Sequence, residues 1–257
     1  MAGEVAKASV RSEAGGQAGA PGVAAAEGVA FEVPDGMLPP MSEADARRMT
    51  ILRSVAVAVQ DGAPYVLKGG SGLAFSRGLP RWSDDLDFDA PRALAIGRRI
   101  EEGLRRAGAK PVTTTLAKDT GTVQRFKLRY EDEAAGGVVA ARVETSFRRP
   151  PVAGDTEAAG GVRVYRVPVQ LAQKLDAIEH RTEARDLFDA WFLLARHGGE
   201  IGPVLAARAD ALTRDEVGLA DAYRAAFEQD ARLAALGAET VVLALREAIE
   251  AAKDRGR

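Results

Sequence analysis

The chain has 257 residues, a formal net charge of −2 and no cysteine, so thiolate metal sites, catalytic cysteines and disulfide frameworks are excluded. With only two histidines, His180 and His197, a three-histidine metal site is excluded as well. The slightly acidic balance excludes a global basic field for coating nucleic acid, and the length is sufficient for a sizeable hydrophobic core.

The first 38 residues are rich in Ala, Gly, Val and Glu and show no sustained hydrophobic period. We therefore expect residues 1–38 to form a disordered, low-complexity tail. The sequence shows neither the apolar core of a signal peptide nor an apolar run of membrane-spanning length. The expected location is cytoplasmic, with no membrane partner.

A mixed-sheet region is predicted over residues 39–167. Ser42, followed by Asp45 three residues later, has the pattern of a capping box and predicts a helix that runs to about Gln60. Leu86 and Phe88 alternate with aspartates and predict a strand with one acidic face, whereas Trp82 is expected in the core. The other elements expected here are a strand at 65–67, a helix at 73–77, a helix from Pro91 to about 107, and strands at 111–116, 123–130, 138–147 and 162–167.

From residue 168 to the end the hydrophobic period is helical, which predicts a second, all-helical region over 168–257. The fold class expected is therefore α+β, with a cleft between the mixed-sheet region and the helical region. The expected helices cover 169–180, 183–197, 204–212, 215–229 and 239–253.

Two carboxylates carry the clearest chemical signal. Asp85 and Asp87 are two residues apart on a predicted strand, so their side chains point the same way. Two like charges at that distance are costly unless a cation lies between them. Mg²⁺ prefers such oxygen ligands and keeps coordination positions for phosphate oxygens, so the pair predicts a metal site that holds a triphosphate. An acidic, solvated strand edge is the alternative.

A glycine-rich turn precedes the acidic pair. A strand that ends in Gly69-Gly70-Ser71 and enters a helix offers bare N–H groups and a hydroxyl to an anion, although such a turn alone can be purely structural. The spacing of a Walker P-loop is absent.

Glu144 is the candidate for a third carboxylate, because it lies on the polar face of its own predicted strand. It would complete the metal site or accept the proton of an attacking hydroxyl. The alternative is a surface salt bridge with Arg142, two residues earlier.

By alternation, four basic side chains share a face with Glu144. Their arrangement predicts a phosphate track for an RNA acceptor, and an ordinary charged sheet surface is the alternative. The residues are Arg125, Lys127, Arg129 and Arg142.

The run LKGGSGLAFSRGLPRWSDDLDF resembles motif I of the AbiEii/AbiGii toxin family of nucleotidyltransferases, within the polymerase-beta-like nucleotidyltransferase superfamily. That family reads approximately Gly-Gly-(Ser/Thr)-Ala-Leu, a spacer, then Arg-x-Ser-x-Asp-(Ile/Leu)-Asp, and Gly72 replaces its usual alanine here. Residues 142–146 are similar to the family's third-carboxylate strand, and residues 174–181 with 185–189 are similar to its helical motif. The resemblance extends over about residues 50–200.

The resemblance implies a polymerase-beta-like mixed sheet with flanking helices over 39–167 and a helical domain over 168–257. It implies that Gly70 and Ser71 hold nucleotide phosphates and that Asp85, Asp87 and Glu144 bind Mg²⁺ and carry catalysis. It also implies that Lys174 contacts the triphosphate as a catalytic residue, with Arg185 and Asp186 shaping the nucleotide site.

The function expected from these residues is Mg²⁺-dependent transfer of NMP from an NTP to a hydroxyl acceptor. By resemblance, the acceptor is RNA such as a tRNA 3′ end, and the protein is the toxin of a toxin–antitoxin or phage-defence pair with a cognate antitoxin. Two alternatives remain at this stage. One is a nucleotidyltransferase acting on a small molecule of the antibiotic type, and the other is a non-catalytic module that binds NTP or an antitoxin.

Overall fold

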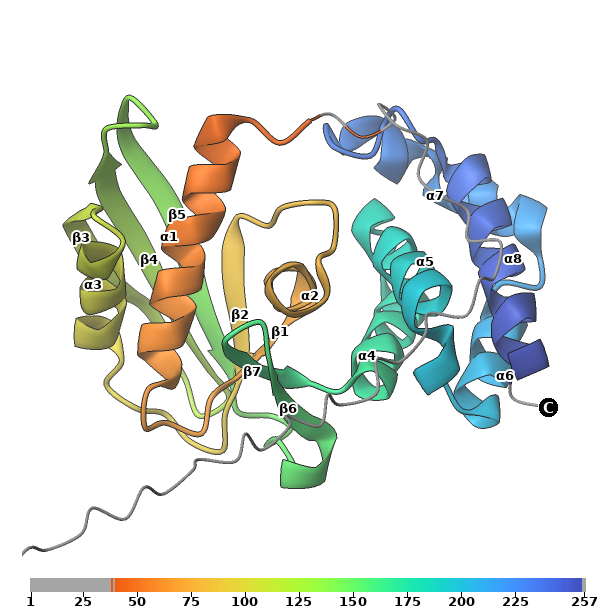
Figure 1. The fold of residues 1–257 in the computed structure, drawn as a ribbon, viewed down its shortest axis with the longest axis horizontal. Helices are drawn as coiled ribbons and strands as arrows, with labels where there is room; N and C mark the ends of the chain where they lie inside the picture. Colours follow the sequence, from red (N-terminus) through yellow and green to blue (C-terminus); the bar gives the residue numbers. More distant parts are fainter. Residues whose placement is uncertain (1–37, 39, 256–257) are drawn as a thin grey trace, which may run out of the picture.

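A computed structural model describes residue 38 and residues 40–255. The predicted tail, apart from Leu38, lies outside the described residues. The described chain forms a mixed seven-stranded sheet with flanking helices, followed by a helical region beside it (Figure 1). The predicted α+β class is confirmed.

The elements follow the order expected from the sequence with few exceptions. The strands are β1 (Val66–Lys68), β2 (Asp85–Asp89), β3 (Lys110–Asp119), β4 (Val123–Asp132), β5 (Gly137–Ser146), β6 (Thr156–Ala159) and β7 (Val162–Tyr165). The α-helices are α1 (Glu43–Gln60), α2 (Gly69–Arg77), α3 (Gly97–Arg106), α4 (Val167–His180), α5 (Ala184–His197), α6 (Pro203–Leu212), α7 (Glu216–Gln229) and α8 (Ala238–Arg255). Two short 3₁₀ helices cover Ala153–Asp155 and Gly198–Glu200.

The strand order is β3-β4-β5-β2-β1-β7-β6, which places β2 at the centre. β2 pairs in parallel with β5 and antiparallel with β1. Leu86 and Phe88 are fully buried on one face of β2, so its three aspartates occupy the other face by alternation. The same alternation on β5 buries Val143 and turns Glu144 toward the face that carries the aspartates.

Two hydrophobic clusters flank the sheet, one on its apolar face and one beyond its polar face. One joins α1 and α3 to the apolar side of the sheet, through residues such as Val55, Phe88 and Ile100. The other joins α2 to the C-terminal helices, through residues such as Leu73 and Phe188. Figure 1 shows α2 beside β1 and β2, between the sheet and helices α4 and α5. The polar face near β2 therefore looks toward α2, α4 and α5.

Helix α3 begins at Gly97, so the prediction that it begins at Pro91 is wrong. Residues 91–96 are not helical. The backbone N–H of Leu94 donates to the Tyr65 hydroxyl at 3.2 Å, and Ile96 is fully buried in the core. These contacts fix the segment in an irregular path before the helix.

The hairpin of β6 and β7 also differs from expectation, because β6 was not predicted. Its sequence, TEAA, lacks an alternating apolar pattern. Gly160 and Gly161 join the two strands with φ values of 58° and 79°, as a two-residue hairpin turn requires. Adjacent glycines before a predicted strand were the available signal for this hairpin.

Within the described residues, no helix has both the length and the apolar character needed to cross a membrane.

Candidate active site

The turn from β1 into α2 brings the backbone close to the acidic strand. Helix α2 begins at Gly69, earlier than predicted, so Gly70 and Ser71 lie in its first turn. Gly69 has φ of 68°, and a Cβ built there would lie 3.4 Å from Asp87 Oδ2. A residue with a side chain would be strained at this position.

Gly70 and Ser71 make contacts with other residues of motif I. A Cβ on Gly70 would come within 2.8 Å of Arg81 Nη2, so the glycine makes room for the Arg81 guanidinium. Ser71 is buried, and its hydroxyl donates to the backbone carbonyl of Asp85. The serine therefore ties the first turn of α2 to the start of the acidic strand.

Asp85 and Asp87 point from the same face of β2 but differ in their partners. Asp85 Oδ2 accepts from Arg142 Nη2 at 2.6 Å. In the part of the chain that the structure describes, the Asp87 carboxylate makes no hydrogen bond or ion pair. Burial raises the pKa of Asp85 more than Arg142 lowers it, and burial also raises the pKa of Asp87 against the charges of Arg142 and Lys68.

Glu144 lies next to Asp87 across the parallel pair of β2 and β5. Its Oε2 accepts from Arg125 Nε at 2.6 Å. The structure therefore brings Glu144 to the strand position adjacent to Asp87, with its carboxylate paired to Arg125.

A cavity of about 610 Å³ opens beside Asp87. The C-terminal ends of β2 and β5 form one side of it, and helices α2 and α4 form the other. Five cationic side chains and four carboxylates line it, and the excess of positive charge favours an anionic ligand. Its charged lining consists of Lys68, Asp87, Asp89, Arg148, Arg149, Lys174, Asp176, Arg181 and Asp186.

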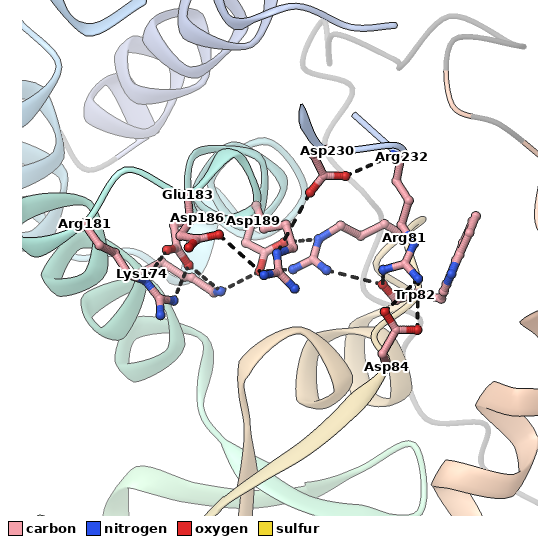
Figure 2. A network of polar contacts seen from close by, with 11 residues as sticks. Arg81, Trp82, Asp84, Lys174, Arg181, Glu183, Asp186, Asp189, Asp230 and Arg232 are labelled. Atoms are coloured by element: carbon pink, nitrogen blue, oxygen red, sulfur yellow. Dashed lines mark hydrogen bonds and ion pairs between the residues drawn. The ribbon is translucent and has the colours of Figure 1, made fainter. Parts of the chain in front are cut away.

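Lys174 is held at the wall of this cavity by two buried carboxylates (Figure 2). Its Nζ lies 3.0 Å from Asp186 Oδ1 and 2.6 Å from Asp189 Oδ2. Each carboxylate has a second cationic partner: Arg181 Nε is 2.8 Å from Asp186, and Arg81 binds Asp189 through Nε at 2.7 Å and Nη2 at 2.6 Å. The chain of ion pairs fixes where the Lys174 ammonium lies.

Asp189 is the most enclosed member of this chain, with no exposed side-chain surface. Burial alone would raise its pKa, but the charges of Arg81 and Lys174 outweigh burial and hold the pKa of Asp189 below its usual value. The carboxylate is therefore ionised and links motif I to helix α5.

The family described as “Nucleotidyl transferase AbiEii toxin, Type IV TA system” matches residues 50–255. The chain belongs to the AbiEii nucleotidyltransferase toxin family. The resemblance inferred from motif I is thereby confirmed, and with it the assignment to a nucleotidyltransferase family.

Two crystal structures from Helicobacter pylori share the fold of this AbiEii-family chain. One is of a candidate nucleotidyltransferase, with a TM-score of 0.77 and 28% identity over 84% of this chain and 97% of that chain. The other is JHP933, with a TM-score of 0.76 and 27% identity over 84% of this chain and 94% of that chain. Among curated proteins, none matches this chain.

The remaining predicted nucleotide residues of the AbiEii-family chain lie in different places. Asp186 lines the cavity and binds Lys174, as described above. Arg185 does not line the cavity, and its guanidinium lies 3.5 Å from Glu183 and 4.0 Å from Asp230. The sequence pattern did not assign Arg148 or Arg149 to the cavity lining, nor Arg81, Arg181 or Asp189 to the ion-pair chain behind Lys174. The i, i+3 spacing of Asp186 and Asp189 was the signal for a shared partner.

The four predicted basic residues do lie on one sheet face together with Glu144. Lys127 pairs with Arg142 and Arg125 pairs with Glu144 across β4 and β5, which shows the alternation directly. Lys127 and Arg129 are exposed, whereas Arg125 and Arg142 are half-buried beside their carboxylate partners. This part of the face does not line the cavity.

The predicted metal ligands are compatible with a divalent ion held partly by substrate. No group of three or more His, Asp or Glu side chains among residues 38 and 40–255 is placed to hold a metal ion by itself. Asp85 and Asp87 nevertheless supply two neighbouring oxygen donors, and Asp87 is unpaired. Mg²⁺ is commonly bound by one or two carboxylates together with phosphate oxygens, so this donor set fits that ion.

Proposed function

We propose that this AbiEii-family protein transfers a nucleoside monophosphate from an NTP to a hydroxyl of RNA, such as a tRNA 3′ end, in a Mg²⁺-dependent reaction. The observation that carries the proposal is the position of Asp87. Its unpaired carboxylate lies at the edge of a cavity with five cationic side chains in its lining, and next to β5, the strand that begins the basic face. A carboxylate in that position lies between a nucleotide in the cavity and an acceptor on the basic face.

The nucleotide occupies the cavity in this proposal. Lys174 contacts the triphosphate, and its ion pairs with Asp186 and Asp189 hold its ammonium group in place. Arg148, Arg149 and Arg181 line the same space and add positive charge for the phosphates, although Arg149 also pairs with Asp176 and Arg181 with Asp186. A preorganised cation of this kind stabilises the charge that develops on the departing pyrophosphate.

Asp85 and Asp87 would hold the Mg²⁺ ion, with Glu144 beside them. The bound ion would supply charge neutralisation for the transferring phosphoryl group. Asp85 and Glu144 are paired with Arg142 and Arg125, so Arg142 must release Asp85 for the ion, and Arg125 must release Glu144 for the proton transfer described below.

The acceptor approaches over the basic face of β4 and β5. Lys127 and Arg129 are exposed there and contact backbone phosphates of the RNA. The acceptor oxygen forms a bond to the α-phosphorus while the bond from that phosphorus to the bridging oxygen breaks, and pyrophosphate leaves with the bonding electrons. Glu144 accepts the proton of the attacking hydroxyl.

A labelling experiment tests this function. Purified protein is incubated with each α-labelled NTP, Mg²⁺ and total RNA, and the RNA is examined for label. We expect transfer with at least one NTP and a loss of at least about a hundredfold in Asp87→Asn, because a carboxylate at the reacting centre is removed. Asp119→Asn, at the exposed end of β3, is the matched control and should transfer normally. Full transfer by Asp87→Asn, or nucleotide binding without pyrophosphate release, would contradict the proposal.

The same chemistry explains a toxin that needs a cognate antitoxin partner, as the family description implies. Unrestrained modification of RNA in the cytoplasm would arrest cell growth. Expression of the wild-type chain alone should therefore inhibit growth, and Asp87→Asn should relieve the inhibition at equal protein level. Inhibition that persists in Asp87→Asn would separate toxicity from nucleotide transfer.

A further inference from the structure

Trp82 is placed unlike the other large aromatic residues of motif I. It is half-buried and belongs to neither hydrophobic cluster, so the prediction that it lies in the core is wrong. The guanidinium of Arg232, from the segment between α7 and α8, lies 4.5 Å from the centroid of its ring (Figure 2). Phe88, by contrast, is fully buried in the sheet core. The indole therefore contributes little to core packing and needs another explanation.

Arg232 is held over the indole by specific contacts. Its Nη2 lies 3.0 Å from both carboxylate oxygens of Asp84, and its Nη1 donates to the Trp82 carbonyl at 3.4 Å. Figure 2 shows the other labelled side chains on the Arg232 side of the indole. The arginine thus stiffens one face of the ring and adds positive charge beside it.

Positive charge continues from this stack onto the sheet. Arg48, on α1, lies 3.3 Å from Asp84 and donates to the carbonyl of Ala140 on β5 at 2.7 Å. Ala140 is the register partner of Arg129. The stack is therefore connected, through Arg48, to the basic face that the proposed RNA acceptor follows.

The stack lies on the opposite side of Asp87 from the nucleotide cavity. Asp87, Asp89 and Ser146 line the cavity, whereas Trp82, Asp84 and Asp85 do not. Because Asp84 directly precedes β2, the stack adjoins the N-terminal end of the acidic strand. A nucleotide in the cavity would leave this side free for the acceptor.

We propose that the Trp82–Arg232 stack is a platform for an unpaired base in the last two nucleotides of a single-stranded RNA 3′ end. The inference rests on the proposed function, and it adds a residue that contacts a base of the acceptor rather than the NTP. Stacking on an aromatic ring backed by arginine tolerates any base, because every base has a flat face. The platform would fix the 3′ end while the basic face holds the phosphates before it.

RNA with and without terminal bases tests the platform. A fluorescein-labelled ten-nucleotide RNA is compared with the same RNA whose last two nucleotides are abasic, so that the phosphates are unchanged. For the wild-type chain we expect the abasic RNA to bind about tenfold more weakly, from the usual contribution of base–aromatic stacking. Trp82→Leu should bind the two RNAs equally, and Trp82→Phe should keep the preference.

The comparison separates stacking from a structural role and from failure of the proposed function. A purely structural Trp82 would weaken both RNAs equally on substitution and leave the preference intact, which would overturn the platform. Equal binding of both RNAs by the wild-type chain, with label still transferred from NTP to RNA, would overturn the platform and leave the proposed function standing. Neither binding nor labelling of any RNA would overturn both.

Discussion

Two groups of ion pairs belong to the candidate active site, and they differ in their contact with solvent. The Arg81–Asp189 pair between motif I and α5 is buried, with 3% and 0% of the two side chains exposed. The Arg142–Asp85 pair on the open sheet face is half-exposed, with 42% and 30%. The two pairs have equal N···O distances of 2.6 Å, so environment rather than geometry distinguishes them.

The contrast indicates different roles. A buried charge that loses its partner carries a large penalty, so the Arg81–Asp189–Lys174 group keeps one arrangement and fixes the cavity wall. A half-exposed pair is worth little, because water screens it and can replace either partner. In the function proposed above, the arginines on the sheet face therefore exchange their carboxylates for phosphates, and the carboxylates exchange their arginines for a metal ion.

Asp189→Asn should give the largest effect on stability. The variant leaves the buried Arg81 without its carboxylate and removes one partner of Lys174, so we expect the free energy of unfolding to fall by about 3–5 kcal/mol. Urea unfolding followed by circular dichroism measures this. Asp221→Asn, which breaks the exposed pair with Arg224, is the control and should change stability by less than about 1 kcal/mol. Similar losses in the two variants would remove the distinction drawn above.

The stability difference between wild type and Asp189→Asn should depend on pH. Because the folded-state pKa of Asp189 lies below its usual value of about 3.9, its stabilising contribution is complete above that pH and is lost as pH falls through the folded pKa. We expect a constant difference from pH 7 to about 5 and a shrinking one below about 4. A stability difference that grows on acidification would show that folding raises the pKa of Asp189 rather than lowering it.

The smallest change in stability is expected on the sheet face. Arg125→Gln and Arg142→Gln should each alter the free energy of unfolding by less than about 1 kcal/mol, since both pairs are half-exposed. In the proposed function each should also weaken RNA binding and lower its dependence on salt. Binding titrations at several salt concentrations, beside urea unfolding, check both parts. Losses of several kcal/mol would place these pairs with the buried group.

The sequence was most informative where function depends on short spacings. The i, i+2 rule placed Asp85 and Asp87 on one face, and the same alternation placed Lys127 with Glu144. The hydrogen bond from Ser71 to the Asp85 carbonyl was not predictable, because it depends on the start of α2 four residues earlier than expected.

Contacts between distant segments were the other gap. Arg81 and Asp189 are separated by 108 positions, and only the packing of α5 against motif I brings them together. Arg232 and Trp82 are separated by 150 positions, and one comes from the helical region while the other comes from the mixed-sheet region. Local periodicity predicts neither pairing, since it carries no information on how the helical region docks.

The course of β2 past Asp87 has a consequence for how such enzymes can diversify. Moving along the strand in one direction leads to Asp89 and the cavity, and moving in the other leads to Asp85 and the Trp82 stack. With the nucleotide at the Asp89 end and the acceptor at the Asp85 end, as proposed, substitutions around residues 146–149 can change the preferred nucleotide while the acceptor contacts stay intact. Substitutions around residues 82–84 can redirect the protein to a new acceptor, and the central carboxylates need not change in either case.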